Sequence, residues 1–150
     1  MDREVVTLVT QVRVDEADPA ITKPTKFIGH TYAKEQAEYF AKQLGWTIAE
    51  QNPSEWRRVV PSPAPHYVMH GKSIKVLVDR GTIVLAAGGG GIPVHNDKNY
   101  RLEGLDAVID KDLTAAMLGR VIRAQELWII TDIDYVYLRF KKVEIGRAHV

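Results

Sequence analysis

Residues 83–94 read IVLAAGGGGIPV, an apolar run followed directly by four glycines, and the fold class is inferred outward from here. Its first five residues, Ile83 to Ala87, are all apolar, which is typical of a central strand in a parallel sheet. The four residues that follow lack Cβ atoms, so their backbone N–H groups can surround an anion. Ligands in open α/β sheets bind at the carboxyl ends of strands, which favours an anion-binding site here. The alternative interpretation is a flexible turn. These residues are Gly88, Gly89, Gly90 and Gly91.

Strand and helix patterns alternate on both sides of this stretch. Residues 5–14 are rich in β-branched side chains and predict a core strand, and residues 127–130 predict a further buried strand. The alternation implies an α/β fold in which helices cover both faces of a sheet. Three segments carry apolar side chains at helical spacing: Ala33, Ala37, Phe40, Ala41 and Leu44, between a Thr31 cap and Gly45; Ile74, Leu77 and Val78, closed by Gly81; and Leu113, Ala116, Met117 and Val121, capped by Asp110 or Asp112.

The composition is that of an ordinary soluble domain. The 150 residues are 45% hydrophobic and 26% charged, and 20 basic residues offset 19 acidic ones without long runs of either sign. We therefore expect no nucleic-acid or membrane partner. The absence of cysteine excludes disulfides and thiolate chemistry, and residues 1–4 do not resemble a signal peptide, so a cytoplasmic location is the default expectation.

A second candidate site is the sequence Asp110-Lys111-Asp112 at a predicted helix start. There the helix N-terminus and the lysine could both face a phosphate, although a capped and solvated helix end explains the pattern too. The segment 131–137 follows a predicted strand and could contact a nucleotide. Two weaker patterns do not predict a site. Gly71-Lys72-Ser73 lacks the first glycine of a phosphate loop. His66 and His70 are not expected to share one face of a helix, as two metal ligands at this spacing would.

Several short motifs together resemble carbamate kinases, of the amino acid kinase superfamily. They occur in the family's order and approximate spacing, and the match covers nearly all of residues 5–142. The combination is highly specific, although the glycine run by itself is not. The motifs are Thr10-Gln11-Val12, Pro24-Thr25-Lys26, Val59-Val60-Pro61-Ser62-Pro63, residues 88–94, Ala107-Val108-Ile109-Asp110-Lys111-Asp112 and residues 131–137.

The resemblance implies a three-layer αβα sandwich with a largely parallel central sheet, in which residues 19–58 form a small protruding lid. It implies that Lys26 reaches from the lid to carbamate and the transferring phosphate, that Lys111 neutralises phosphoryl charge, and that Asp112 orients the lysines. The glycine loop would border the substrate, and ATP or ADP would bring Mg²⁺ to the site. The implied nucleotide contacts are Thr131, Asp134 and Tyr137, and the implied assembly is a homodimer.

The resemblance also implies that the chain is incomplete. Two glycine-asparagine loops of the family precede its Met1, and a C-terminal lysine segment follows its last residue. Residues 1–143 would be a partial kinase domain, inactive alone. Residues 144–150, EIGRAHV, match the translation of a common sequencing adapter, so we expect a non-native tail, with a genuine basic tail as the alternative.

Two local departures from the family pattern concern the lid and the glycine loop. Residues 52–55, NPSE, replace a glycine-rich stretch before Arg57, and His30 and His95 replace the expected neighbours of the two loops. Two other functions stay open, a noncatalytic nucleotide-binding module and a sibling kinase with another acceptor.

Overall fold

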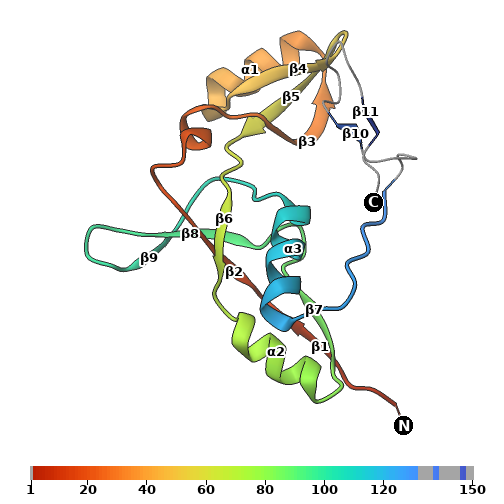
Figure 1. Cartoon of the computed structure of the whole chain (residues 1–150). Helices are drawn as coiled ribbons and strands as arrows, with labels where there is room; N and C mark the ends of the chain where they lie inside the picture. The colour runs from red at the N-terminus through yellow and green to blue at the C-terminus, as the bar shows by residue number, and fades with distance from the viewer. Residues whose placement is uncertain (1, 132–136, 139–145, 148–150) are drawn as a thin grey trace.

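The computed structural model describes residues 2–131, 137–138 and 146–147 (Figure 1). The elements are β1 (Val5–Leu8), β2 (Gln11–Val14), the 3-10 helix η1 (Pro19–Thr22), β3 (Lys26–Tyr32), α1 (Lys34–Leu44), β4 (Ile48–Asn52), β5 (Glu55–Val60), β6 (Pro65–Val68), α2 (Gly71–Asp79), β7 (Ile83–Ala86), β8 (Ile92–Asn96), β9 (Leu102–Gly104), α3 (Lys111–Ile122), β10 (Tyr137–Leu138) and β11 (Gly146–Arg147).

The body of the molecule is a sheet in two consecutive parts. Strand β1 pairs in parallel with β7, with Val6 opposite Val84. Further along the same two chain segments, β2 pairs in parallel with β8, while β6 and β9 flank them as antiparallel strands in the order β6-β2-β8-β9. The α/β class and the parallel centre of the sheet are therefore confirmed.

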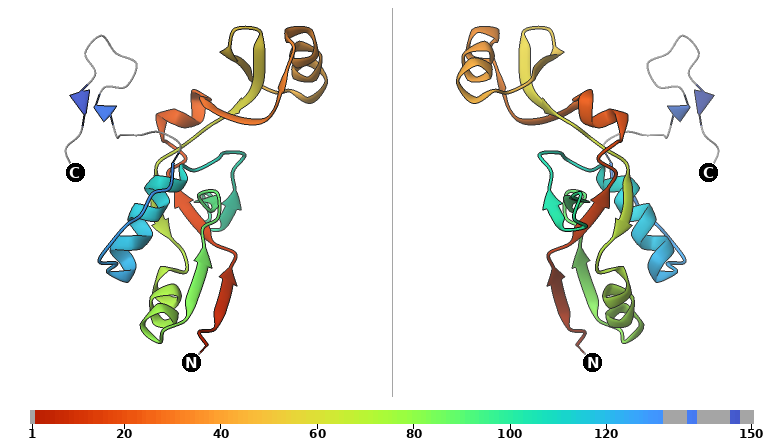
Figure 2. Two further views of the ribbon diagram at one scale, coloured as in Figure 1. Left: turned by 90° about the vertical axis from the view of Figure 1, so that its right-hand side faces the viewer. Right: turned by 90° about the vertical axis from the view of Figure 1, so that its left-hand side faces the viewer.

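Both body helices lie on the same face of this sheet (Figure 2). The core between the sheet and the helices is built from buried aliphatic residues of β2, β6, α2 and the segment before α3. On the opposite face, within the described residues, no helix is present, and apolar side chains there are exposed. The core residues are Val12, Val14, Val68, Ile74 and Ile109, and the exposed ones are Val5, Val9, Ile83, Leu85 and Ile92.

A protruding unit, residues 26–60, stands away from the body (Figure 1). Its antiparallel sheet has the order β3-β5-β4, and α1 packs against it through the buried Ala37. The rings of Tyr32 and Trp46 both lie against Phe40, with centroids 5.1 and 5.5 Å away. The three rings form a small aromatic cluster within the unit.

Three local expectations are wrong. Ala33, not Thr31, is the N-cap of α1, and no side chain caps that helix, although Gly45 ends it in the left-handed conformation as predicted. The face of α3 that packs on the core contains Thr114 and Met117, whereas Leu113 is 54% exposed. Thr114 can be buried in place of an apolar residue because its hydroxyl donates to Gly90 O. Residues 127–130 form no strand and are exposed. Their apolar composition alone does not make a strand, because a strand also needs neighbouring strands and side chains to pack against.

Within the described residues, no helix combines the length and the apolar character that crossing a bilayer requires.

Candidate functional site

The glycine loop is a sharp bend that only glycine fits at two positions. Gly90 has φ +124°, and a Cβ atom there would lie 2.3 Å from the carbonyl oxygen of Ile109. At Gly91, with φ +89°, a Cβ atom would lie 2.4 Å from Cγ2 of Val12. The loop therefore packs tightly between the start of β2 and the chain that leads into α3, so it is not a loose turn.

Two threonines that the sequence analysis gave no role hold this loop. The hydroxyl of Thr10 accepts a hydrogen bond from Ala87 N at 2.9 Å and donates to Leu8 O at 2.9 Å. The fully buried hydroxyl of Thr114 donates to Gly90 O at 2.9 Å. These bonds tie both ends of the loop to the sheet and to α3. The sequence contained one signal for them, since Thr10 belongs to a motif of the resemblance.

The N-terminus of α3 lies directly beyond the loop. Asp110 is its N-cap, and its Oδ1 atom accepts from Asp112 N at 2.9 Å and from Leu113 N at 3.3 Å. Lys111 is the first helical residue, with a side chain 65% exposed and its Nζ 3.6 Å from Asp112 Oδ1. An exposed lysine at the positive end of a helix dipole suits an anionic ligand.

Lys26 reaches this helix start from the protruding unit. Its Nζ atom lies 3.1 Å from Asp110 Oδ2, across 84 residues of sequence. The backbone of the unit's base supports this approach, because Thr25 N donates to Val60 O and Val108 N donates to Pro61 O. The structure thus brings Lys26 and Lys111 to one helix end, and the ion pair of Lys26 is with Asp110, whereas Asp112 pairs with Lys111.

The charge environment of Asp110 follows from these contacts. Partial burial tends to raise the pKa of this carboxyl, but the hydrogen bond from Lys26 and those from the amides of Asp112 and Leu113 outweigh burial. The pKa of Asp110 is therefore lowered, and the side chain is a carboxylate at neutral pH.

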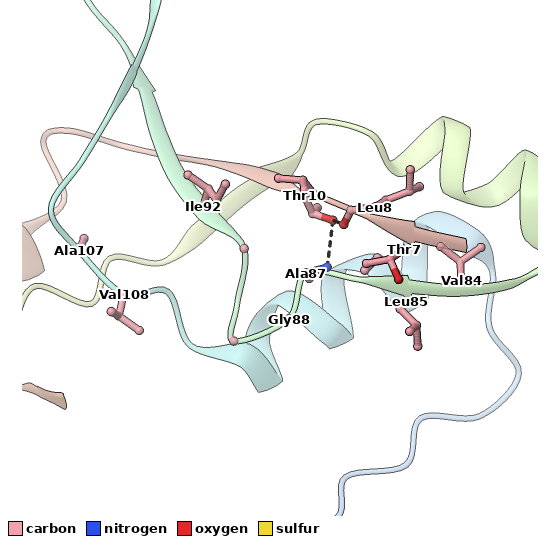
Figure 3. Close-up of a pocket in the computed structure, with 14 residues that line it drawn as sticks. Thr7, Leu8, Thr10, Val84, Leu85, Ala87, Gly88, Ile92, Ala107 and Val108 are labelled. Carbon is pink, nitrogen blue, oxygen red and sulfur yellow. Dashed lines mark hydrogen bonds between the residues drawn. The ribbon is translucent and has the colours of Figure 1, made fainter. Parts of the chain in front are cut away.

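An open cavity of about 770 Å³ lies on the uncovered face of the sheet, beside the glycine loop (Figure 3). Leu85 and Thr7 line it from the β-strands, and Ala107 and Val108 line it from the segment before α3. Three of the four loop glycines border it, whereas Gly90 is buried behind them. None of the described residues that line the cavity is charged, so Lys26 and Lys111 lie outside its walls.

The predicted nucleotide contacts are at the edge of the described chain. Thr131 is the last residue of the long described range, and Asp134 lies outside the described residues. Tyr137 belongs to β10, which pairs with β11 through Arg147. These three assignments stay predictions. Among the described residues, no group of three or more His, Cys, Asp or Glu side chains could hold a metal ion.

A family model covers nearly the whole chain. A model of the family described as "Amino acid kinase family" matches residues 7–147. The chain belongs to the amino acid kinase family. The match contains the glycine loop and the start of α3, as well as the protruding unit, so the expected fold type is confirmed.

Two curated relatives similar to this chain are named carbamate kinases. A carbamate kinase of Staphylococcus epidermidis is 50% identical over 140 residues, which are 93% of this chain and 45% of the relative. Carbamate kinase 3 of Staphylococcus aureus is 49% identical over 142 residues, 95% of this chain and 46% of the relative. The chain thus spans about half the length of the curated relatives it matches.

Solved structures agree with this fold. A protein from Aeropyrum pernix K1 superposes with a TM-score of 0.80 at 34% identity, over 95% of this chain and 46% of that one. The carbamate kinase from Giardia lamblia bound to AMP-PNP superposes with a TM-score of 0.74 at 36% identity, over 97% of this chain and 46% of that one.

Proposed function

We propose that this chain supplies part of the active site of a kinase that transfers a phosphoryl group between ATP and carbamate. The observation that carries the proposal is the placement of Lys26 from the protruding unit at the α3 N-terminus, beside Lys111. Relatives about half identical to this chain and named carbamate kinases support the choice of acceptor. In this proposal residues 19–58 act as a lid, and residues 1–143 are one partial kinase domain.

In the proposed reaction a carbamate oxygen forms a bond to the γ-phosphorus of ATP while the bond from that phosphorus to the ADP oxygen breaks. The reverse reaction makes ATP from carbamoyl phosphate and ADP. Enzymes accelerate such transfers mainly by alignment and by stabilising charge on the moving group. Lys26 and Lys111 would supply that positive charge, and Asp112 would orient Lys111, to which it is already paired.

The remaining parts of the proposed site bind rather than react. Backbone N–H groups of residues 88–91 would border the substrate, since the bend exposes Gly88 and Gly89. Thr131, Asp134 and Tyr137 would contact the nucleotide, which would carry Mg²⁺ on its phosphates. We further propose a cytoplasmic homodimer that makes ATP during arginine breakdown.

The test is a coupled assay of ATP formation from carbamoyl phosphate and ADP, made with the complete gene product that carries this chain. Lys111→Ala is expected to lower kcat by orders of magnitude without unfolding the protein. Lys72→Ala is the matched control, because Lys72 is also an exposed lysine in the first turn of a body helix. Unchanged turnover in Lys111→Ala would refute the assignment.

Lys26→Ala tests the proposed lid. Part of its loss should appear as a higher KM for carbamoyl phosphate, because the lysine would bind the substrate phosphate from across the site. Lys42→Ala is the control, since Lys42 lies exposed on α1 of the same unit. A Lys26→Ala variant with unchanged KM and kcat would contradict a role for the lid cation.

The same assay separates the alternatives. We expect the 150-residue chain by itself to be inactive, and robust ATP formation by it would contradict that expectation. Normal nucleotide affinity without phosphotransfer in the complete gene product would favour a noncatalytic nucleotide-binding module. Activity with another acceptor in a substrate panel, and none with carbamate, would favour a sibling kinase of the family.

A further inference from the structure

Asp110 divides its two carboxylate oxygens between two separate tasks. Oδ1 caps α3 by accepting from the backbone amides of Asp112 and Leu113. Oδ2 accepts the hydrogen bond from Lys26 Nζ, 3.1 Å away in the protruding unit. The Asp110 side chain therefore both caps α3 and holds the ammonium group of Lys26, a residue 84 positions away in the sequence.

A second ion pair joins the same two parts of the molecule. Arg58 Nη2, from β5, lies 2.7 Å from Asp106 Oδ2 in the segment before α3. Between the two ion pairs, Val108 N donates to Pro61 O at 3.0 Å. The guanidinium of Arg58 also lies over the ring of Trp46, 5.3 Å from its centroid. The base of the protruding unit is thus attached to residues 106–110 by three contacts.

The ion pair of Lys26 is accessible enough to exchange. Its side chain is 39% exposed and that of Asp110 is 35% exposed, so water and solutes reach the pair. Pairs of this kind stabilise a structure only weakly. An anion bound at the α3 N-terminus could therefore take Lys26 from Asp110 without a large cost.

We propose that Asp110 is a positioning residue, which holds Lys26 at the α3 N-terminus and, with the Arg58–Asp106 pair, latches the protruding unit onto the body. The bound phosphoryl group then replaces Oδ2 as the partner of Lys26. The nature of this anion rests on the proposed function, whereas the latch does not. Asp110 acts on the reaction through Lys26 and does not contact the reacting atoms.

The first test measures the latch itself by double electron–electron resonance. The chain contains no cysteine, so Gln43→Cys on α1 and Ser73→Cys on α2 provide two unique spin-label positions, both exposed. We expect a narrow distance distribution in the parent chain. It should become broader or longer in the Asp106→Asn/Asp110→Asn double variant, since asparagine still caps a helix but carries no charge.

Two further variants control this measurement. Asp79→Asn removes the same charge from the Lys75–Asp79 pair within α2 and should leave the distribution unchanged. Lys26→Gln removes one latch contact from the other side without touching the helix cap, and should broaden the distribution as Asp110→Asn alone does. Distributions of the double variant and Lys26→Gln that superpose on that of the parent would overturn the latch.

The second test asks whether Asp110 works through Lys26, using kcat/KM of the complete gene product. Asp110→Asn is expected to lower kcat/KM roughly ten- to hundredfold, because a misplaced binding group costs a reaction about that much. In a Lys26→Gln background the same change should have almost no further effect. An equal loss in both backgrounds would overturn the positioning role. If the complete gene product has no carbamate phosphotransfer at all, the proposed function fails, and the distance measurement still decides the latch.

Discussion

Replacing Gly90 with alanine should destabilise the chain while replacing its neighbour Gly89 should not. The added methyl group at Gly90 would lie 2.3 Å from Ile109 O and 2.9 Å from Ile109 C, which are backbone atoms that cannot rotate away. The residue also has φ +124°, a conformation that side-chain-bearing residues rarely adopt. Gly89 is exposed, has no positive φ and would meet nothing within 4 Å.

The magnitude follows from three contributions. Backbone strain at Gly90 costs about 1–3 kcal/mol, and forcing a methyl group into a filled space costs about 1–3 kcal/mol more. Alanine restricts the unfolded chain, which offsets about 0.4–1 kcal/mol of this. The net loss in the free energy of unfolding is about 1–6 kcal/mol for Gly90→Ala. Gly89→Ala lacks the first two contributions, so its stability should be equal or slightly higher.

The assay is urea unfolding of the parent, Gly90→Ala and Gly89→Ala chains, monitored by tryptophan fluorescence and far-ultraviolet circular dichroism. With a slope of about 2 kcal/mol per molar urea, a loss of about 3 kcal/mol lowers the midpoint by about 1.5 M. Equal midpoints for Gly90→Ala and Gly89→Ala would refute the conclusion that the loop is tightly packed. A Gly90→Ala chain that fails to fold while Gly89→Ala folds normally would agree with it.

Three further predictions concern the loop support, the carboxylates and the uncovered sheet face. Thr114→Val should lose about 1–3 kcal/mol in urea unfolding, because it leaves the buried Gly90 carbonyl without its 2.9 Å donor, whereas Thr114→Ser keeps the hydroxyl and should lose less; equal losses would contradict the hydrogen bond's importance. The pKa of Asp18 is lowered by hydrogen bonds from the amides of Ala20 and Ala64, and that of Asp110 is lowered as described, so both carboxylates stabilise the fold above their unfolded pKa of about 4. That contribution should disappear as the pH falls through the lower folded values, and thermal unfolding of Asp18→Asn measured from pH 7 to 2 should depend less on pH than that of the parent; parallel curves would refute the assignment. Leu85→Lys should reduce binding of the dye ANS without loss of stability, since Leu85 is 54% exposed on the apolar face. Val84→Lys is the control and should unfold the chain, because the side chain of Val84 packs against the core. Undiminished dye fluorescence in Leu85→Lys would place the apolar surface elsewhere.

Local patterns were sufficient for α1, α2, α3 and β7. The apolar run before the glycines predicts β7, and the structure has it at Ile83–Ala86 in a parallel pair. Asp110 is one of two caps that the sequence proposes for α3, and it is the observed one. These features depend on side chains within a few residues of each other, which is why reading the sequence finds them.

Local patterns failed where burial depends on distant partners. The segment 127–130 has the composition of a buried strand but lies exposed, since composition does not show which neighbours are present. Thr114 interrupts the apolar stripe of α3 yet is fully buried, because Gly90 O accepts its hydroxyl proton. A polar residue enters a core when a distant group satisfies it, and the spacing of apolar residues carries no information about that group.

Residue type and short-range spacing were enough for the α/β class, the glycine bend and Lys111 at a helix start, whereas Lys26 was a candidate only through the resemblance to carbamate kinases. Only the tertiary structure decided that Lys26 pairs with Asp110 rather than Asp112, and that helices cover one face of the sheet within the described residues. The reason is that an ion pair between residues 84 positions apart depends on how two packed units meet, and no local propensity specifies that meeting.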